Sequence, residues 1–155
     1  MDTEPISILN QNIDEKVIQD DSENSGLMIE KIVDSYENVT IYFLIYLFKE
    51  QDSTKTNLVS KSAPIFIWIG ENVSAPSIDS LLVSMKTPMD NQPSLSEIFS
   101  SQLASNAATM IKRIVMKYNT QAFISYNISQ DVPELHLYVE KRLFQLLNQY
   151  YAASK

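Results

Sequence analysis

The chain has no cysteine among its 155 residues, and it has only two glycines and one histidine. The missing cysteine excludes disulfides, thiolate catalysis and cysteine-ligated metals. Two glycines, Gly26 and Gly70, are too few for a glycine-rich loop that cradles phosphate, and one histidine does not make a metal cluster. We therefore expect no enzyme activity, no cofactor and no metal site, and a protein whose work is binding.

Long apolar runs and a net positive charge are also missing. The longest apolar run, residues 39–48, is far shorter than the about 20 residues that a membrane helix needs. The first residues carry acids where a secretion signal carries positive charge. The net charge of −7 disfavours nucleic acid and anionic membranes as partners. We expect a soluble protein of the cytoplasm, with the nucleus left open as a second location.

The acidity is concentrated at the N-terminus. Residues 1–24 hold seven acids and one base, whereas the rest of the chain is nearly neutral. We therefore divide the chain into an acidic and partly disordered segment, residues 1–25, and a single α+β domain, residues 26–155. The apolar patch Ile6-Ser7-Ile8-Leu9 is either an edge strand or mobile.

Hydrophobic periodicity predicts several strands, then a helix, a further strand and a last helix. The Ser94-x-x-Glu97 pattern is typical of a helix start, and an apolar stripe continues to Tyr118. A second helix begins at Pro133 and carries His136 and Glu140, which we interpret as a solvent-exposed pair on its surface. The predicted strands cover residues 27–33, 39–49, 63–70, 81–86 and 120–129. This order predicts an α+β fold, a largely antiparallel sheet with two long helices on one face.

The strand Ile65-Phe66-Ile67-Trp68-Ile69 is apolar on both of its faces. The helix stripes are aliphatic, so we assign the isoleucines to the helix layer. Phe66 and Trp68 then face the other way, together with Tyr42, Leu44 and Tyr46 of the neighbouring strand. Either loops cover this second face, or the sheet of a partner chain packs on it in a dimer, and we favour the partner.

Two stretches resemble a known family. Residues 123–128 read Phe-Ile-Ser-Tyr-Asn-Ile and lead into a last helix with Val139-Glu140-Lys141-Arg142, and an earlier strand, Ile65–Gly70, carries the tryptophan. This arrangement resembles the proteasome assembly chaperone 4 family, and within it a fungal-type member. The resemblance covers roughly residues 63–71 and 93–148. The acidic segment and loop 51–62 have no counterpart in it.

The resemblance implies a heterodimer with a related type 3 proteasome assembly chaperone, in which the two sheets pack on each other. It also implies binding to alpha-type proteasome subunits, notably alpha subunit 5, and a role in assembling the alpha ring of the core particle. No enzymatic activity is implied. The candidate partner-interface residues are Tyr42, Leu44, Tyr46, Phe66, Trp68, Phe123 and Ser125.

Two other functions stay open. One is an adaptor subunit of a trafficking or signalling complex with a longin- or roadblock-like module, since those folds also combine a small sheet with helices and also dimerise. The other is a small-molecule-binding domain or degenerate enzyme, which the missing polar constellation disfavours. Fold by itself does not separate the adaptor from the chaperone.

Overall fold

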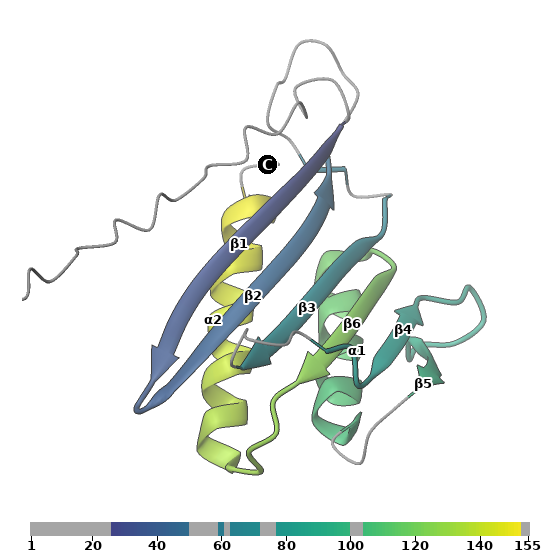
Figure 1. Cartoon of the computed structure of the whole chain (residues 1–155). Coiled ribbons are helices and arrows are strands. Elements are labelled where there is room, and N and C mark those ends of the chain that lie inside the picture. Colours follow the sequence, from purple (N-terminus) through teal and green to yellow (C-terminus); the bar gives the residue numbers. More distant parts are fainter. Residues whose placement is uncertain (1–25, 50–58, 61–62, 72–76, 100–103, 153–155) are drawn as a thin grey trace, which may run out of the picture.

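The computed structural model describes residues 26–49, 59–60, 63–71, 77–99 and 104–152. It shows a twisted sheet with two helices on one face (Figure 1). The elements in chain order are β1 (Leu27–Tyr36), β2 (Val39–Phe48), β3 (Ile65–Glu71), β4 (Leu81–Met85), β5 (Ser94–Phe99), α1 (Ala104–Tyr118), β6 (Ala122–Asn127) and α2 (Pro133–Ala152). The α+β class expected from the sequence is therefore present.

The sheet is mixed, which corrects the expectation of an antiparallel one. Its strand order is β1-β2-β3-β6-β4-β5, and β3 pairs with β6 in parallel while the neighbouring pairs are antiparallel. β4 follows β3 in the sequence, yet it pairs with β6. The last strand thus enters the sheet beside β3. Parallel neighbours need a long crossover connection, and β4, β5 and α1 provide it here.

The first two strands form a long hairpin. A two-residue turn, Glu37-Asn38, joins Tyr36 to Val39, and Glu37 has a φ of 52°. β1 therefore extends three residues beyond the predicted end at Val33. The longer pairing arises because the alternating pattern of "LMIEKIVDSY" matches the whole length of β2.

The segment that begins at Ser94 is a strand, so the helix start predicted there is wrong. Residues 94–99 form β5 and pair with β4, and α1 begins at Ala104. The Ser94 hydroxyl donates a hydrogen bond to the Met85 carbonyl across the hairpin and caps no helix. Pairing with β4 outweighs the local capping pattern, because a capping box contributes only about 1 kcal/mol.

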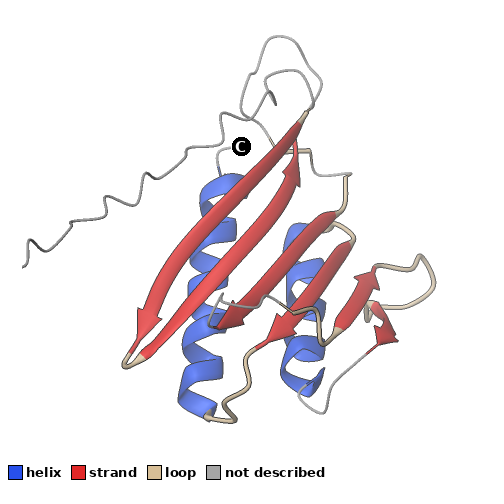
Figure 2. Ribbon diagram, in the orientation of Figure 1, coloured by secondary structure: helices blue, strands red, loops and turns tan. Residues whose placement is uncertain are grey.

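Both helices cover the same face of the sheet (Figure 2). The core lies between the two layers, where Ile41, Ile45, Ile67 and Ile124 are fully buried beneath aliphatic side chains of α1 and α2. The Arg113 guanidinium forms an ion pair with Glu140 at 2.5 Å and so links α1 to α2.

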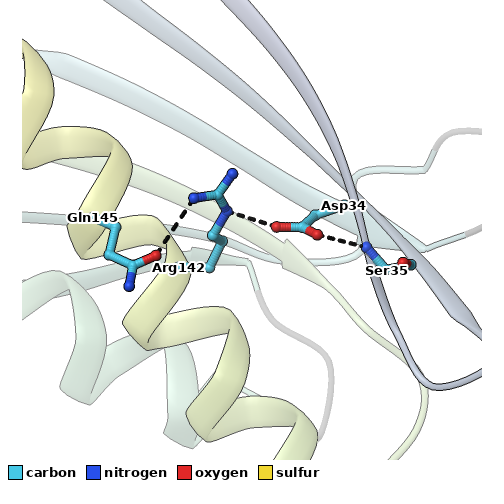
Figure 3. Close-up of polar contacts among 4 residues, drawn as sticks. All are labelled: Asp34, Ser35, Arg142 and Gln145. Carbon is cyan, nitrogen blue, oxygen red and sulfur yellow. Dashed lines mark hydrogen bonds and ion pairs between the residues drawn. The ribbon is translucent and has the colours of Figure 1, made fainter.

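A second ion pair joins the helix layer to the edge strand. Arg142 of α2 donates from Nε to Asp34 Oδ2 of β1 at 2.6 Å, and the Ser35 backbone N–H donates to the other oxygen of Asp34 (Figure 3). Burial raises the pKa of the Asp34 carboxyl, but hydrogen bonds from Ser35, Tyr138 and Arg142 outweigh burial and hold it below 3.8. The carboxylate therefore fixes α2 beneath the β1–β2 hairpin in its ionised form.

The acidic segment 1–25, with Ile6, Ile8 and Leu9, lies outside the described residues. Its separation from a domain at 26–155 stays a prediction. Of the polar loop 51–62 the structure describes residues 59 and 60, where Val59 is buried and bridges to Lys49.

Candidate functional site: an open apolar sheet face

The alternation of side chains gives β2 and β3 two different apolar faces. Ile65, Ile67 and Ile69 point to the helix layer and are at most 1% exposed. Phe66 and Trp68 point the opposite way and are half-buried. In β2 the side chains of Tyr42, Leu44 and Tyr46 share the face of Phe66 and Trp68, because the register places Leu44 opposite Trp68 and Tyr46 opposite Phe66.

These side chains line a groove on the face away from the helices. The groove has a volume of about 950 Å³. Five of the predicted interface residues, Tyr42, Leu44, Tyr46, Phe66 and Trp68, line it. The Tyr46 and Phe66 rings meet edge to face at 5.6 Å between centroids, an arrangement that favours ordered aromatic packing. We call this surface the open face.

Trp68 is held in place on the open face by two features of the chain. Its indole Nε1 donates a hydrogen bond to the Ser77 carbonyl at 2.9 Å. Its ring lies over Gly70, where an added Cβ would come within 2.3 Å of the Trp68 ring. Gly70 therefore provides the space that the indole fills, which explains why glycine stands at the end of β3.

The other two predicted interface residues lie on β6. Phe123 is half-buried and stands opposite Phe66 in the parallel pairing, on the same face of the sheet. Ser125 is 0% exposed, and its hydroxyl accepts a hydrogen bond from the Asn127 amide. Ser125 therefore does not reach the surface of the groove, although it shares that face.

Asn127 joins three segments beside the open face. Its amide nitrogen also donates to the Ile69 carbonyl at 3.2 Å, and its amide oxygen accepts from the Asp79 backbone N–H at 2.7 Å. The amide thereby fixes the connection before β4 against the ends of β3 and β6. The Ser-Tyr-Asn triplet thus supports the site structurally.

The sequence reasoning omitted several side chains of the same surface. Lining residues outside the predicted set include Leu27, Val33, Phe48 and Ile78. Val33 is 62% exposed and Ile78 is 54% exposed, which is a large exposure for aliphatic side chains. Strict alternation through the predicted strand 27–33 would have identified Val33, but Ile78 precedes β4 and no periodic signal marks it.

The interpretation of His136 as a solvent-exposed residue is wrong. It is 7% exposed, and its Nδ1 lies 2.6 Å from the Tyr126 hydroxyl of β6. Burial, and then the charges of Glu71 and Glu140, raise the pKa of Tyr126, so the phenol stays protonated beside the imidazole. Glu140 pairs with Arg113 instead of His136. The first turn of α2 packs against the sheet, so His136 points to β6. The sequence before Pro133 gives no sign of which side of the helix start faces the sheet.

The described residues offer little for chemistry. Among them no cluster of three or more acidic or histidine side chains could hold a metal ion. Within the same ranges no helix is long and apolar enough to cross a membrane. The most prominent feature of these residues is thus an open apolar surface, as expected for a protein that binds another macromolecule.

Comparisons with known proteins agree with this description. The model of the family described as proteasome assembly chaperone 4 matches residues 55–128, from the segment before β3 to the residue after β6. The resemblance to this family inferred from the sequence is confirmed, while its part in residues 129–148 lies outside the matched range and the fungal-type assignment stays a prediction. Phe66, Trp68, Phe123 and Ser125 lie within the matched range, whereas β1, β2 and α2 lie outside it.

A mouse protein named proteasome assembly chaperone 4 is 28% identical over 79 residues, which are 51% of this chain and 62% of the mouse protein. The match therefore spans somewhat less than two thirds of that relative. A crystal structure of a chaperone complex for yeast 20S proteasome assembly contains a chain with the same fold. The TM-score is 0.62 at 15% identity, and the alignment covers 81% of this chain and 98% of the yeast one.

Proposed function

We propose that this chain is a proteasome assembly chaperone subunit that works as one half of a heterodimer. Its partner is a related type 3 chaperone, and the open face is where the partner's sheet packs. The pair binds alpha-type subunits, notably alpha subunit 5, and promotes assembly of the alpha ring in the cytoplasm, with the nucleus as a second site.

The observation that carries this proposal is the open face itself. Half-buried aromatic side chains from β2 and β3 line a groove of about 950 Å³ on the side of the sheet that neither of the two described helices covers. A stable protein interface hides about 800 Å² on each partner, and aromatic side chains supply most of its affinity. Sheet-on-sheet packing would cover this surface and leave the helix layer free for a further partner.

The likeness to the chaperone 4 family supports the choice of partner. The mouse relative carries the name of that family, and the yeast chain of the same fold belongs to a complex for 20S proteasome assembly. A chaperone of this kind acts by binding and needs no catalytic group, in line with the absence of cysteine from the whole chain.

Co-purification from cell extract in mild salt tests the function directly. We expect a second small chaperone and alpha-type proteasome subunits in the bound fraction, identified by mass spectrometry. Recovery of vesicle-coat or signalling subunits without proteasome subunits would contradict the proposal and indicate the longin- or roadblock-like adaptor. The variant Leu44→Lys, which places a charge on the open face, should lose the chaperone partner in the same experiment.

A further inference from the structure

A second groove lies on the helix layer, and it is positively charged. It has a volume of about 480 Å³ and is lined by Gln92, Lys112, Arg113, Met116, Lys117 and Phe144. Helix α1 carries three cations and no carboxylate along its length. Among the described residues no carboxylate lies within ion-pair distance of Lys112 or Lys117, so Glu140 beside Arg113 offsets only part of the charge.

Apolar side chains accompany these cations. Met116 is 47% exposed. Phe144 of α2 also lines the groove, and the Lys117 ammonium lies 5.1 Å from the centre of its ring. A groove with cations and exposed apolar side chains fits a peptide that carries carboxylates and a few aliphatic residues.

The same chain contains such a peptide. Residues 1–24 carry seven acids and one base. The apolar patch at Ile6, Ile8 and Leu9 lies between Glu4 and Asp14, so acids flank aliphatic side chains on both sides. The open face, by contrast, presents aromatic side chains and one lysine, and it attracts an acidic peptide less. We propose that the acidic segment 1–24 binds the basic groove between α1 and α2 of its own chain.

The topology places the two within reach. β1, β3 and β6 run in the same direction, so the start of β1 and the start of β6 lie at one end of the sheet. α1 ends at Tyr118, just before β6 begins at Ala122, and its basic residues therefore lie at that end as well. Gly26, whose carbonyl accepts a hydrogen bond from Lys49, marks where the acidic segment joins the domain.

The length of the connection also fits. Three strand spacings separate β1 from β6, about 14 Å at about 4.8 Å each, and the helix layer lies about 10 Å below. Sixteen residues, 10–25, connect Leu9 to Gly26. Fully extended, that many residues span at most about 50–58 Å, so the apolar patch and its flanking acids Glu4 and Asp14 are within reach of the groove. A tether that can span the distance raises the effective concentration, so even weak ionic contacts become populated.

Zero-length carbodiimide cross-linking of the purified full chain, together with any partner that co-purifies, tests this contact. The reagent couples carboxylates to amines that touch them, and peptide mass spectrometry identifies the pairs. We expect the acids of residues 1–24 to couple to Lys112 and Lys117 several-fold more than to Lys86, which is exposed after β4. At about 0.5 M salt this preference should disappear, because the ionic contacts are screened.

A chain without native cysteine permits a second, independent readout. A dye on Ser7→Cys should show lower anisotropy in the Lys112→Gln/Lys117→Gln variant, and Lys86→Gln with Lys141→Gln is the matched control of equal charge. Equal coupling to all exposed lysines, or equal anisotropy in both variants, would overturn the proposal. Mixing ¹⁴N- and ¹⁵N-labelled chains distinguishes a contact within one chain from one between copies, and only the former agrees with it. Co-purification shows separately whether the Lys112→Gln/Lys117→Gln variant still binds the chaperone partner, so a failure of this proposal is distinguished from a failure of the proposed function.

Discussion

Trp68 and Ile69 are neighbours in β3 whose side chains point to opposite faces of the sheet. Trp68 lies in the open-face groove, whereas Ile69 is 0% exposed in the core. We expect Trp68→Ala to weaken heterodimer formation by about 2 kcal/mol, roughly thirtyfold in affinity, because aromatic anchors carry most interface energy. Pull-down titration against the partner measures this loss, and the bound proteasome subunit should disappear with it.

Ile69→Ala is the control for that experiment. It leaves a cavity between sheet and helices and should lower the free energy of unfolding by about 2–5 kcal/mol. Trp68 is the only tryptophan, so its emission spectrum reports on the open face alone. An emission spectrum that is identical with and without the partner would show that Trp68 does not lie in the interface.

The Asp34–Arg142 pair predicts a pH dependence of stability. The pKa of Asp34 is lowered below its ordinary 3.8 in the folded chain, so its contribution is complete above about pH 4 and is lost as the pH falls through the folded value. Asp34→Asn should therefore lower the free energy of unfolding by about 1 kcal/mol at pH 7 and by clearly less at pH 3. Chemical denaturation at the two pH values measures this difference.

Glu140→Gln provides the comparison, since its partner Arg113 is 60% exposed and solvent screens that pair. Its effect at pH 7 should be smaller than that of Asp34→Asn. If Asp34→Asn lowers the free energy of unfolding equally at both pH values, the Asp34 side chain contributes through its packing and not through its charge.

At the scale of elements, local sequence patterns correctly predicted the strands that are apolar on both faces. They failed for segments whose secondary structure depends on pairing with a distant neighbour. "IFIWI" has no reasonable alternative to a strand, and the assignment of its two faces followed from alternation together with the aliphatic stripes of the helices. The Ser94-x-x-Glu97 pattern, in contrast, is short and polar, and its strand form depends on a neighbour that only the hairpin with β4 supplies. The buried His136 depends likewise on Tyr126, which becomes a neighbour only when α2 packs on β6.

The acidic segment is the element whose removal we expect to matter least for folding. Its composition gives it little apolar area to offset the entropy of ordering, and a tethered ionic contact near half occupancy stabilises by only about 0.4 kcal/mol. Deleting residues 1–24 should leave the melting temperature of the heterodimer nearly unchanged. Differential scanning calorimetry of the two forms tests this.

A large fall in melting temperature or in yield would contradict that expectation. It would indicate that Ile6, Ile8 and Leu9 pair with an edge of the sheet, which a local apolar patch permits. A deletion that lies within the acidic stretch but spares the patch, residues 14–24, then separates the two causes.

At the scale of the molecule, the sequence carries no direct signal for the parallel pairing of β3 with β6. Those strands lie more than 50 residues apart, with two strands and a helix between them. Because such a pairing is set by how the whole sheet closes over the helices, hydrophobic periodicity predicts each strand and not its neighbour. The same sequence did predict that the two helices leave one apolar face of the sheet open. The strands have two apolar faces, and the two helices cover only one of them.

The uncovered face leads to the prediction that the chain expressed alone self-associates. Solvent-exposed apolar side chains on a sheet attract one another, and two copies can pack their open faces when no other partner is present. We expect sedimentation velocity to show concentration-dependent association of the isolated chain and a defined 1:1 complex after co-expression with a type 3 chaperone.

Val33→Glu places a charge on this surface, where Val33 is 62% exposed, and should reduce the self-association without a loss of stability. Met89→Glu is the matched control, because Met89 is 97% exposed on the β4–β5 connection and does not line the open face. Both variants change the charge equally, so a similar effect of the two would assign the association to net charge. An isolated chain that stays monomeric at high concentration would contradict the model of two packed sheets, because the open face would then be stable in water by itself.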